Sequence, residues 1–412
     1  MSTSTIPTSA APPSAPSRRA DKPAPGSGLD GLVVADTAIS EVDGERGQLV
    51  VAGHSIEALA GHVPFAAACC LLLDGALPDA AATAAMSRRL GAARQAAAAR
   101  LGVCGPALQL ADPMDALRAL LAGHTAPLPP AGEPARSAAL RDEAIALLGA
   151  APVYVAAWAR AHGKAGQAPG HATHATHAVH AAHELQPDPA RDHAADYLRL
   201  LGGGDDPARA AALDAYLVTV LEHGMNASTF TARVVASTGS DTVSAVVAAL
   251  GALKGPLHGG APGPVLDMLD AIAEPPQAVA WLEAELVAGR RVMGMGHRVY
   301  RVRDPRAAVL ERAIERLEAA GVRTPRLALA RAVERAAEDV LGRRYPDRPL
   351  RANVEFYTAV LLDAAGLDRA LFTPTFAVGR IAGWCAHVAE QRRTGRLIRP
   401  DSRYIGPRTS GA

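Results

Sequence analysis

The sequence is poor in aromatic residues, in cysteine and in net charge. Phe, Trp and Tyr make up only 4% of the 412 residues, and because strands are enriched in aromatic and β-branched residues, this composition disfavours an all-β fold. Alanine, the best helix former, is frequent throughout the chain. A single core stops growing at roughly 250–300 residues, so a chain of this length with 49% hydrophobic residues is expected to form two domains of closely packed helices.

The balanced charge and the cysteine spacing exclude further classes of protein. The 42 basic and 41 acidic residues give a net charge of +1, so no overall field attracts the chain to nucleic acid or to an anionic membrane. Cys69, Cys70, Cys104 and Cys385 show no metal-ligand spacing, which is typical of reduced core cysteines in cytosolic proteins. No apolar run reaches the ~18–20 residues that span a bilayer, and the first thirty residues lack the apolar region of a secretory signal. We therefore predict a cytoplasmic protein.

Stretches rich in Pro, Gly, Ser and Asp interrupt the regular hydrophobic pattern and divide the chain into segments. Residues 1–29 are rich in Pro, Ser and Ala, which predicts a disordered tail. The glycine-punctuated residues 44–53 carry the one strong strand signal and predict a short β-hairpin. Further along, breaks rich in Pro, Gly and Asp leave helices of ordinary length.

Five histidines recur at every third position between residues 171 and 183, with mostly alanine and threonine between them. An α-helix turns by about 300° in three residues, so these side chains drift around the axis and cannot converge on one ion. We interpret the tract as a low-complexity loop, with adventitious binding of Ni²⁺ or Zn²⁺ as its consequence, and predict no metal site; a metal-sensing histidine tract is the alternative.

The most informative segment is GMGHRVYRVRDPR, residues 294–306. Asp304 is a good N-cap and Pro305 a good first helical residue, so Arg306 is expected in the first turn of a helix. A cation there opposes the helix dipole unless an anionic ligand faces both the guanidinium and the free N–H groups. With His297 nearby, the segment predicts a site for a carbonyl compound that carries negative charge; a solvated surface arginine is the alternative.

Two further histidines lie at the ends of predicted helices. His223 closes a helix that begins at Asp206 and Pro207, where the helix C-terminus favours a positively charged imidazole and thus a carboxylate ligand; a simple C-cap histidine is the equal alternative. His258 lies between Pro256 and a Gly-Gly pair, which permits close approach of a ligand, although a lone loop histidine is more often structural.

Charged residues in apolar surroundings complete the set of candidates. Glu355 lies among Val354, Phe356 and Tyr357, where a carboxylate is expected to have a raised pKa and to act as a base; an outward-facing glutamate on an amphipathic helix is the alternative. Arg380 falls on the apolar face of a predicted helix and needs an anionic partner, either a ligand or a distant carboxylate.

These residues together suit the removal of a proton next to a carbonyl, the stabilisation of an enolate and the binding of a dicarboxylate. The sequence lacks a Walker loop, a dinucleotide fingerprint and a Gly-x-Ser-x-Gly elbow. Nucleotide hydrolysis, hydride transfer and serine hydrolysis are therefore disfavoured.

Several long motifs occur in the order found in one known family: EHGMNASTFTARVVAST, GALKGPLHGGAP, GMGHRVYRVRDPRA, ANVEFY and LFTPTFAVGRIAGWCAHVAEQ. On these motifs the chain closely resembles citrate synthases of the short type, which include 2-methylcitrate synthases. The resemblance runs from about residue 31 to residue 407. It implies a nearly all-α, two-domain fold with a short N-terminal β-hairpin, in which a large domain (30–258 and 367–412) is closed over the substrates by a small domain (259–366).

The resemblance also implies a role for each candidate residue. His258 matches the histidine that stabilises the acetyl-CoA enol, and His297 matches the one that polarises the keto group of oxaloacetate. Glu355 occupies the position of the catalytic base. The oxaloacetate carboxylates are held by residues that match His223, Arg306, Arg380 and, contributed across a homodimer or higher homo-oligomer interface, Arg399. Coenzyme A is expected to bind near Met293, Gly294, Met295, Gly296 and Arg351.

The chain departs from the family pattern at several positions. Glu355 replaces the usual aspartate, and one added methylene moves the carboxylate by about 1.5 Å, a displacement that can cost ~10²-fold in rate. Ala352 replaces a proline, Gly224 a glutamate, and Ala52 an arginine that many relatives have.

The predicted activity is the condensation of acetyl-CoA with oxaloacetate to citrate and coenzyme A, as in the tricarboxylic acid cycle, with no metal or redox cofactor. Two alternatives stay open. The first is a 2-methylcitrate synthase or an enzyme of dual specificity, because one methylene in an acyl pocket discriminates by only ~1–3 kcal/mol. The second is a ligand-binding paralogue impaired by the change at Glu355.

Overall fold

The structure, a computed structural model, describes residues 28–29, 31–124, 133–165, 185–260 and 262–407. Residues 38–412 form one compact unit and residues 1–37 form another. The predicted tail at residues 1–29 lies outside the described residues apart from Gly28 and Leu29, and the predicted histidine-rich loop at 171–183 lies outside them entirely.

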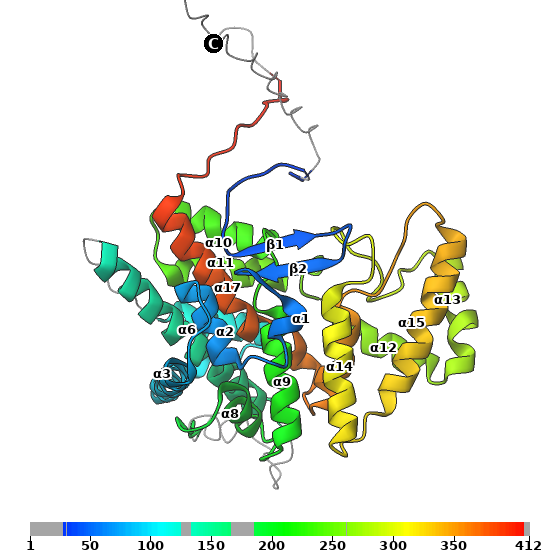
Figure 1. Cartoon of the computed structure of the whole chain (residues 1–412), viewed down its shortest axis with the longest axis horizontal. Helices are drawn as coiled ribbons and strands as arrows, with labels where there is room; N and C mark the ends of the chain where they lie inside the picture. Colours follow the sequence, from blue (N-terminus) through cyan, green and yellow to red (C-terminus); the bar gives the residue numbers. More distant parts are fainter. Residues whose placement is uncertain (1–27, 30, 125–132, 166–184, 261, 408–412) are drawn as a thin grey trace, which may run out of the picture. The chain divides into compact units, whose positions relative to one another are not determined.

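The described residues are mostly helical, which confirms the predicted all-α fold (Figure 1). The α-helices are α1 (Ile56–Leu59), α2 (Phe65–Asp74), α3 (Ala80–Ala99), α4 (Gly105–Leu108), α5 (Pro113–Ala122), α6 (Glu133–Ala161), α8 (His193–Leu200), α9 (Pro207–Val220), α10 (Ala227–Ser237), α11 (Thr242–Lys254), α12 (Pro262–Ile272), α13 (Ala278–Val287), α14 (Pro305–Ala319), α15 (Pro325–Arg344), α16 (Val354–Ala364) and α17 (Phe372–Thr394).

The predicted hairpin is present and is extended by a third strand. Strands β1 (Ser40–Asp43), β2 (Gln48–Val51) and β3 (His54–Ser55) form an antiparallel sheet in the order β1-β2-β3. The β1–β2 turn packs closely on the segment that contains His297, because a Cβ atom on Gly44 would lie 2.2 Å from the carbonyl oxygen of Val299. The backbone N–H of Arg301 donates to the Gly44 carbonyl at 2.9 Å.

Helix α17 is the central helix of the core, and α2, α6, α9, α10 and α11 pack against it (Figure 1). Glycine permits its close contact with the end of α9. A Cβ atom on Gly383 would lie 2.4 Å from the Leu221 carbonyl oxygen, and the Gly383 N–H donates to the same oxygen at 3.1 Å. This contact holds the segment that leads to His223 against α17.

Helices α12, α13, α15 and α16 pack on one another, while α14 packs on both α9 and α16. Apart from α9, these helices fall within the predicted small domain, residues 259–366. Figure 1 shows α12, α13 and α15 on the side remote from α3 and α6. Because contacts join residues 38–412 into one unit, the boundaries of the small domain stay a prediction.

Helix α6 corrects one expectation from the sequence. Residues Arg136–Ala161 are long enough and apolar enough to cross a membrane by length and composition, but 83% of the apolar window is buried inside the protein. The length of uninterrupted apolar runs did not predict this segment, because scattered polar residues interrupt it. Burial on this scale is typical of a core helix, so α6 is weak evidence for a membrane span.

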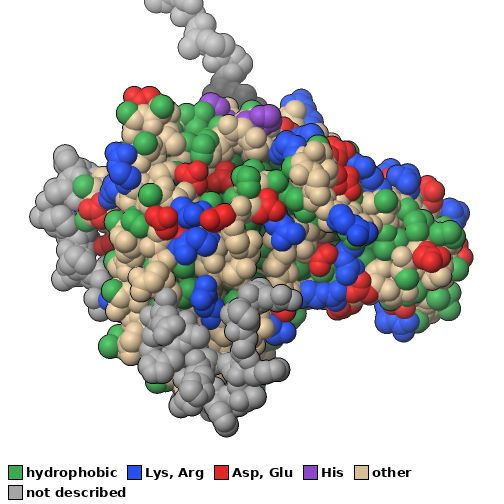
Figure 2. Space-filling model, turned by 90° about the horizontal axis from the view of Figure 1, so that it is seen from below, with side chains coloured by type: hydrophobic (Ala, Val, Ile, Leu, Met, Phe, Trp, Pro, Cys, Tyr) green, Lys and Arg blue, Asp and Glu red, His purple; other side chains and the backbone are tan. Residues whose placement is uncertain are grey.

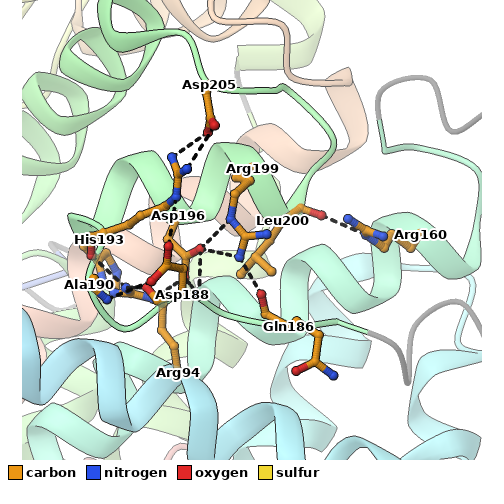
Figure 3. Close-up of polar contacts among 11 residues, drawn as sticks. Arg94, Arg160, Gln186, Asp188, Ala190, His193, Asp196, Arg199, Leu200 and Asp205 are labelled. Atoms are coloured by element: carbon orange, nitrogen blue, oxygen red, sulfur yellow. Dashed lines mark hydrogen bonds and ion pairs between the residues drawn. The ribbon is translucent and has the colours of Figure 1, made fainter.

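A buried ion pair joins α3 to α8 (Figure 3). Arg94 Nε lies 2.7 Å from Asp196 Oδ2, and both side chains are fully buried. Arg94 Nη2 also donates to the carbonyl oxygens of Asp188 (3.0 Å) and Arg191 (2.9 Å), and Arg199 Nη2 donates to Asp196 Oδ1 at 2.7 Å. Both charges are therefore hydrogen-bonded, and the network fixes the loop that precedes α8.

Candidate active site

The segment 294–306 is joined to the start of α16 by backbone contacts. Gly294 and Gly296 have φ values of 73° and 86°, a left-handed conformation that favours glycine. The Gly296 N–H donates to the Arg351 carbonyl at 2.7 Å, and the Asn353 N–H donates to the Gly294 carbonyl at 2.9 Å. A Cβ atom on Gly294 would lie 2.8 Å from Phe356 Cδ2. These contacts bring His297 to the turn that contains Glu355.

The backbone fixes the tautomer of His297. Its Nδ1 atom accepts the N–H groups of Val299 (3.0 Å) and Tyr300 (3.1 Å), so Nδ1 carries no proton and the neutral ring carries its proton on Nε2. Burial, with a smaller contribution from the positive charge of Arg306, lowers the pKa of His297 to about 4. His297 is therefore a neutral Nε2–H donor at physiological pH, as required to polarise a keto oxygen.

His223 lies beside His297 but is not cationic. The two ring centroids are 5.4 Å apart, and His223 Nε2 lies 3.1 Å from the hydroxyl oxygen of Tyr300. Burial and then the charge of Arg306 hold its pKa well below 6.5. The expectation of a positively charged imidazole was wrong, because α9 ends at Val220 and burial outweighs the field of the helix terminus.

Arg306 is in the first turn of α14, as predicted, and it is buried with 2% exposure. The alternative of a solvated surface arginine is therefore excluded. Asp304, itself buried, accepts from Arg306 Nε at 3.0 Å and from Nη2 at 2.7 Å. The same carboxylate caps α14 through the Arg306 N–H at 3.0 Å and accepts the Val354 N–H at 3.2 Å. Asp304 thus joins α14 to α16 and orients the guanidinium.

Arg380 is fully buried on α17 and retains an unused donor. Its Nε donates to the Val220 carbonyl, and its guanidinium carbon lies 4.6 Å from the centroid of the Phe376 ring. Nη2 is buried and has no hydrogen-bond partner among the described residues. Burial lowers its pKa to about 10, although the negative charge of Glu222 acts in the opposite direction. A buried guanidinium with a free N–H favours the binding of an anion.

Glu355 has the properties of a base. It lies in the first turn of α16, and its Oε2 atom is buried without a hydrogen-bond partner in the described part of the chain. Burial raises its pKa to about 7, and the charges of Arg306 and Arg380 limit the rise. The predicted raised pKa is therefore confirmed. The alternative of an outward-facing glutamate on an amphipathic helix is wrong.

His258 is held by a hydroxyl group. Its Nε2 lies 2.8 Å from Ser228 Oγ, which accepts the Trp384 Nε1–H at 3.1 Å and lies 2.8 Å from Asn226 Oδ1. The single Ser228 proton thus has two candidate acceptors, and when it is donated to His258 Nε2 the ring carries its own proton on Nδ1. Burial lowers the pKa of His258 to about 4, so the ring is neutral.

The sequence argument did not find Ser228, Tyr300 or Asp304 as parts of the site. Asp304 was predicted as an N-cap but not as the partner of Arg306. The spacing of two residues between Asp304 and Arg306 could have indicated this pair. Tyr300 lies three residues after His297, within the segment already selected. No local pattern identified Ser228, which meets His258 only through the packing of α10.

A model of the family described as "Citrate synthase, C-terminal domain" matches residues 28–401 of the chain. The chain belongs to the citrate synthase family.

Several curated members of this family are similar to the chain. "Putative citrate synthase 2" of Mycobacterium tuberculosis is 52% identical over 205 residues, which are 50% of this chain and 54% of that relative, so this match spans about half the length of the relative. A citrate synthase of Haloferax volcanii is 37% identical over 92% of this chain and 95% of its own length. A 2-methylcitrate synthase of Mycobacterium tuberculosis is 34% identical over 92% of this chain and 90% of its own length.

Solved citrate synthases have the same fold. The enzyme of Thermotoga maritima aligns with a TM-score of 0.78 at 29% identity, over 94% of this chain and 97% of its own. A citrate synthase of Thermoplasma acidophilum, solved as a ternary complex with carboxymethyl coenzyme A and oxaloacetate, aligns with a TM-score of 0.77 at 25% identity, over 93% and 97% of the two chains.

The remaining residues that the citrate synthase pattern assigns are Arg399 and the predicted coenzyme A-binding residues, of which Gly294, Met295, Gly296 and Arg351 contact the catalytic segment through their backbones. Arg399 is exposed in the segment that follows α17, and Figure 1 shows this segment leaving the helical body. Arg351 is exposed and its Nη1 lies 2.5 Å from Glu338 Oε2. Met295 is buried and forms a backbone bridge with Ala352. Their roles at a subunit interface and in binding coenzyme A stay predictions.

The described residues contain no group of three or more His, Cys, Asp or Glu side chains that could hold a metal ion. All four cysteines are free.

Proposed function

We propose that this chain condenses acetyl-CoA with oxaloacetate and hydrolyses the product thioester to release citrate and coenzyme A. The proposal rests on Glu355, whose Oε2 atom is buried without a hydrogen-bond partner among the described residues and whose pKa is about 7. Glu355 closely follows the backbone of Arg351 and Asn353, which is hydrogen-bonded to the segment that contains His297. A base of this pKa is deprotonated in a useful fraction of molecules at neutral pH.

Each residue has a defined part in the reaction. Glu355 removes a proton from the methyl carbon of the acyl group, and the electron pair moves onto the thioester oxygen, where His258 donates from Nδ1. The enol carbon then attacks the keto carbon of oxaloacetate, while the Nε2–H of His297 is donated to the developing alkoxide. Water cleaves the thioester in the last step, so the acyl carbon becomes the new carboxylate of citrate.

The substrate carboxylates are assigned to the cationic residues. Arg380 offers the free Nη2 atom, and Arg306 is oriented by Asp304. His223 is neutral and donates or accepts through Nε2, which lies 3.1 Å from the Tyr300 hydroxyl oxygen. The solved relative that contains oxaloacetate and a coenzyme A analogue supports the same pair of substrates here.

The test is thiol release from acetyl-CoA in the presence of oxaloacetate, with Glu355→Gln as the inactive reference. The proposal predicts release that depends on both substrates and falls by at least 10²-fold in the variant. No release by the wild-type protein, and none gained in Glu355→Asp, would instead identify a ligand-binding paralogue that has lost catalysis.

A second candidate uses propionyl-CoA and produces 2-methylcitrate. The similarity to a 2-methylcitrate synthase over nearly the whole chain supports it, and the proposed residues would act identically on a methylene group. The ratio of kcat/KM for acetyl-CoA to that for propionyl-CoA, measured with oxaloacetate, separates the two activities and a dual-specificity enzyme.

We further propose that the protein works in the cytoplasm, in the tricarboxylic acid cycle, as a homodimer. Its four free cysteines suit a reducing compartment, and the exposed position of Arg399 suits a residue contributed to a neighbouring subunit. Residues 259–366 are proposed to close over the substrates and to exclude water during proton transfer.

A further inference from the structure

A cavity of about 140 Å³ lies at the junction of α9, α15 and α16, away from the residues of the candidate active site. Its lining comes from the start of α9, the connection between α14 and α15, and the end of α16. Three arginines line it, Arg209, Arg323 and Arg326, against a single carboxylate, Asp363.

The three guanidinium groups differ in how far they are neutralised. Arg326 Nε lies 2.8 Å from Asp363 Oδ2, and its Nη1 contacts Asp270. Arg209 Nε lies 3.3 Å from Asp206 Oδ2 but is buried without a hydrogen bond to the described residues. Arg323 is exposed and has no hydrogen bond or ion pair within the described part of the chain. The ion pairs with Asp206, Asp270 and Asp363 balance the charges of Arg209 and Arg326, so the donors left unused among the described residues are Arg209 Nε and the guanidinium of Arg323.

Close packing aims Arg209 at this cavity. Gly366 follows α16 with φ of 89°, and a Cβ atom there would lie 3.0 Å from Arg209 Nη1. Thr324, at the N-cap position of α15, does not cap that helix with its side chain, because its hydroxyl group contacts Glu318 instead.

The cavity lies at the far ends of two helices that lead to the active site. Helix α9 begins at the cavity and runs toward His223, whereas α16 begins beside Glu355 and ends at the cavity. The two helices contact each other and extend by roughly 21 Å and 16 Å at about 1.5 Å per residue. A ligand in the cavity would therefore bridge α9 to α15 and α16 without contact with the reacting atoms.

We propose that this cavity, lined by Arg209, Arg323 and Arg326, binds a small dianion of the phosphate or short dicarboxylate class. Arginine pairs bidentately with such oxyanions. The volume corresponds to about four or five water molecules at about 30 Å³ each, which accommodates an anion of this size. Figure 2 shows one face of the molecule, on which basic and acidic side chains are interspersed.

The test is calorimetric titration of the full-length protein with inorganic phosphate and, separately, with succinate. Arg323→Ala removes an exposed side chain that has no partner to lose, so folding is expected to be unaffected. The matched control is Arg343→Ala, which removes an exposed arginine from the other end of α15. A further variant, Arg209→Gln, removes the charge beside Gly366.

The proposal is supported if the wild-type protein binds one of the two anions and this binding weakens at least tenfold in Arg323→Ala and in Arg209→Gln. In Arg343→Ala the binding should weaken by less than twofold. Absence of binding of both anions, or equal binding by all four proteins, overturns it. Anions that enter the active site are recognised separately, because they compete with oxaloacetate in steady-state assays and are insensitive to Arg323→Ala. The binding readout needs no turnover, so its failure is distinct from failure of the proposed condensing activity.

Discussion

Glu355 is the residue on which the proposed chemistry depends most. Its Oε2 atom is buried without a hydrogen-bond partner among the described residues, and burial raises its pKa to about 7. His258 and His297 both have pKa values near 4 and stay neutral throughout the range in which Glu355 titrates. The decrease in activity at acidic pH is therefore expected to report the protonation of Glu355 alone.

The first prediction is the pH dependence of kcat/KM for acetyl-CoA. The rate is expected to rise with pH as Glu355 loses its proton, with a midpoint near 7. Glu355→Asp is expected to lower kcat about 10²-fold, because the shorter side chain withdraws the base from the carbon acid. A pH profile that is flat between pH 5 and 8 would contradict this assignment.

The second prediction concerns stability at the same residue. Burial raises the pKa of Glu355 in the folded protein above its ordinary value of about 4.5 to about 7, so the folded state binds the proton more tightly and the free energy of unfolding falls as pH rises from 4.5 to 7. Glu355→Gln removes this unfavourable ionisation and is expected to be more stable than wild type by about 3 kcal/mol at pH 8. Below pH 4.5 the two proteins should unfold alike in thermal scans.

The third prediction concerns Ser228 as the residue that sets the tautomer of His258. When Ser228 donates its proton to Nε2 rather than to Asn226 Oδ1, Nδ1 carries the proton that the thioester oxygen needs. Ser228→Ala removes this preference for the Nδ1 tautomer. We expect kcat to fall about 10-fold while KM for oxaloacetate is unchanged. An equal change in KM and kcat, or loss of folding in circular dichroism, would show that Ser228 only supports packing.

At the scale of the elements, the sequence predicted the helices and their caps better than the contacts between them. The Asp-Pro pairs that start α9 and α14 and the glycines of segment 294–306 follow from local backbone physics, and the structure contains them where expected. The pairing of Asp304 with Arg306, the meeting of Ser228 with His258 and the burial of α6 depend on tertiary packing. No periodicity in the sequence specifies them.

The fourth prediction is that the network of Arg94 and Asp196 is essential to the junction of α3 and α8. Breaking a buried ion pair leaves an uncompensated charge and costs about 3–5 kcal/mol, so Arg94→Met is expected to destabilise by that amount in denaturant unfolding. Arg89→Met, which removes a partly exposed arginine from the same helix, is the control and should cost less than 1 kcal/mol. Similar losses in the two variants would refute a special role for the buried pair.

At the scale of the whole molecule, the order of the sequence motifs was enough to predict the family and the all-α architecture. The same motifs do not specify how subunits assemble. Arg399 lies in the exposed segment after α17, and no contact among the described residues joins it to Arg306 or Arg380. We therefore predict that Arg399 enters the active site of a second subunit.

The fifth prediction is complementation between two inactive variants. If Arg399 serves the neighbouring site, a hybrid dimer of Arg399→Ala and Glu355→Gln chains has one site with both defects and one site with neither. Co-expressed and separated by two affinity tags, the hybrid is expected to recover about half of the wild-type activity per dimer, since additivity holds for independent sites. Each parental homodimer stays impaired, and a hybrid no more active than its parents would place Arg399 outside the neighbouring site.

The contact between the β1–β2 turn and Val299 has a consequence for how the enzyme is made. The turn emerges early from the ribosome, and the segment that contains His297 emerges only after most of the chain has been translated. Closing so long a loop is slow compared with forming local helices. The catalytic segment therefore takes its final conformation as a late event of biosynthesis, and nascent chains that stop short of it have helices but no functional site.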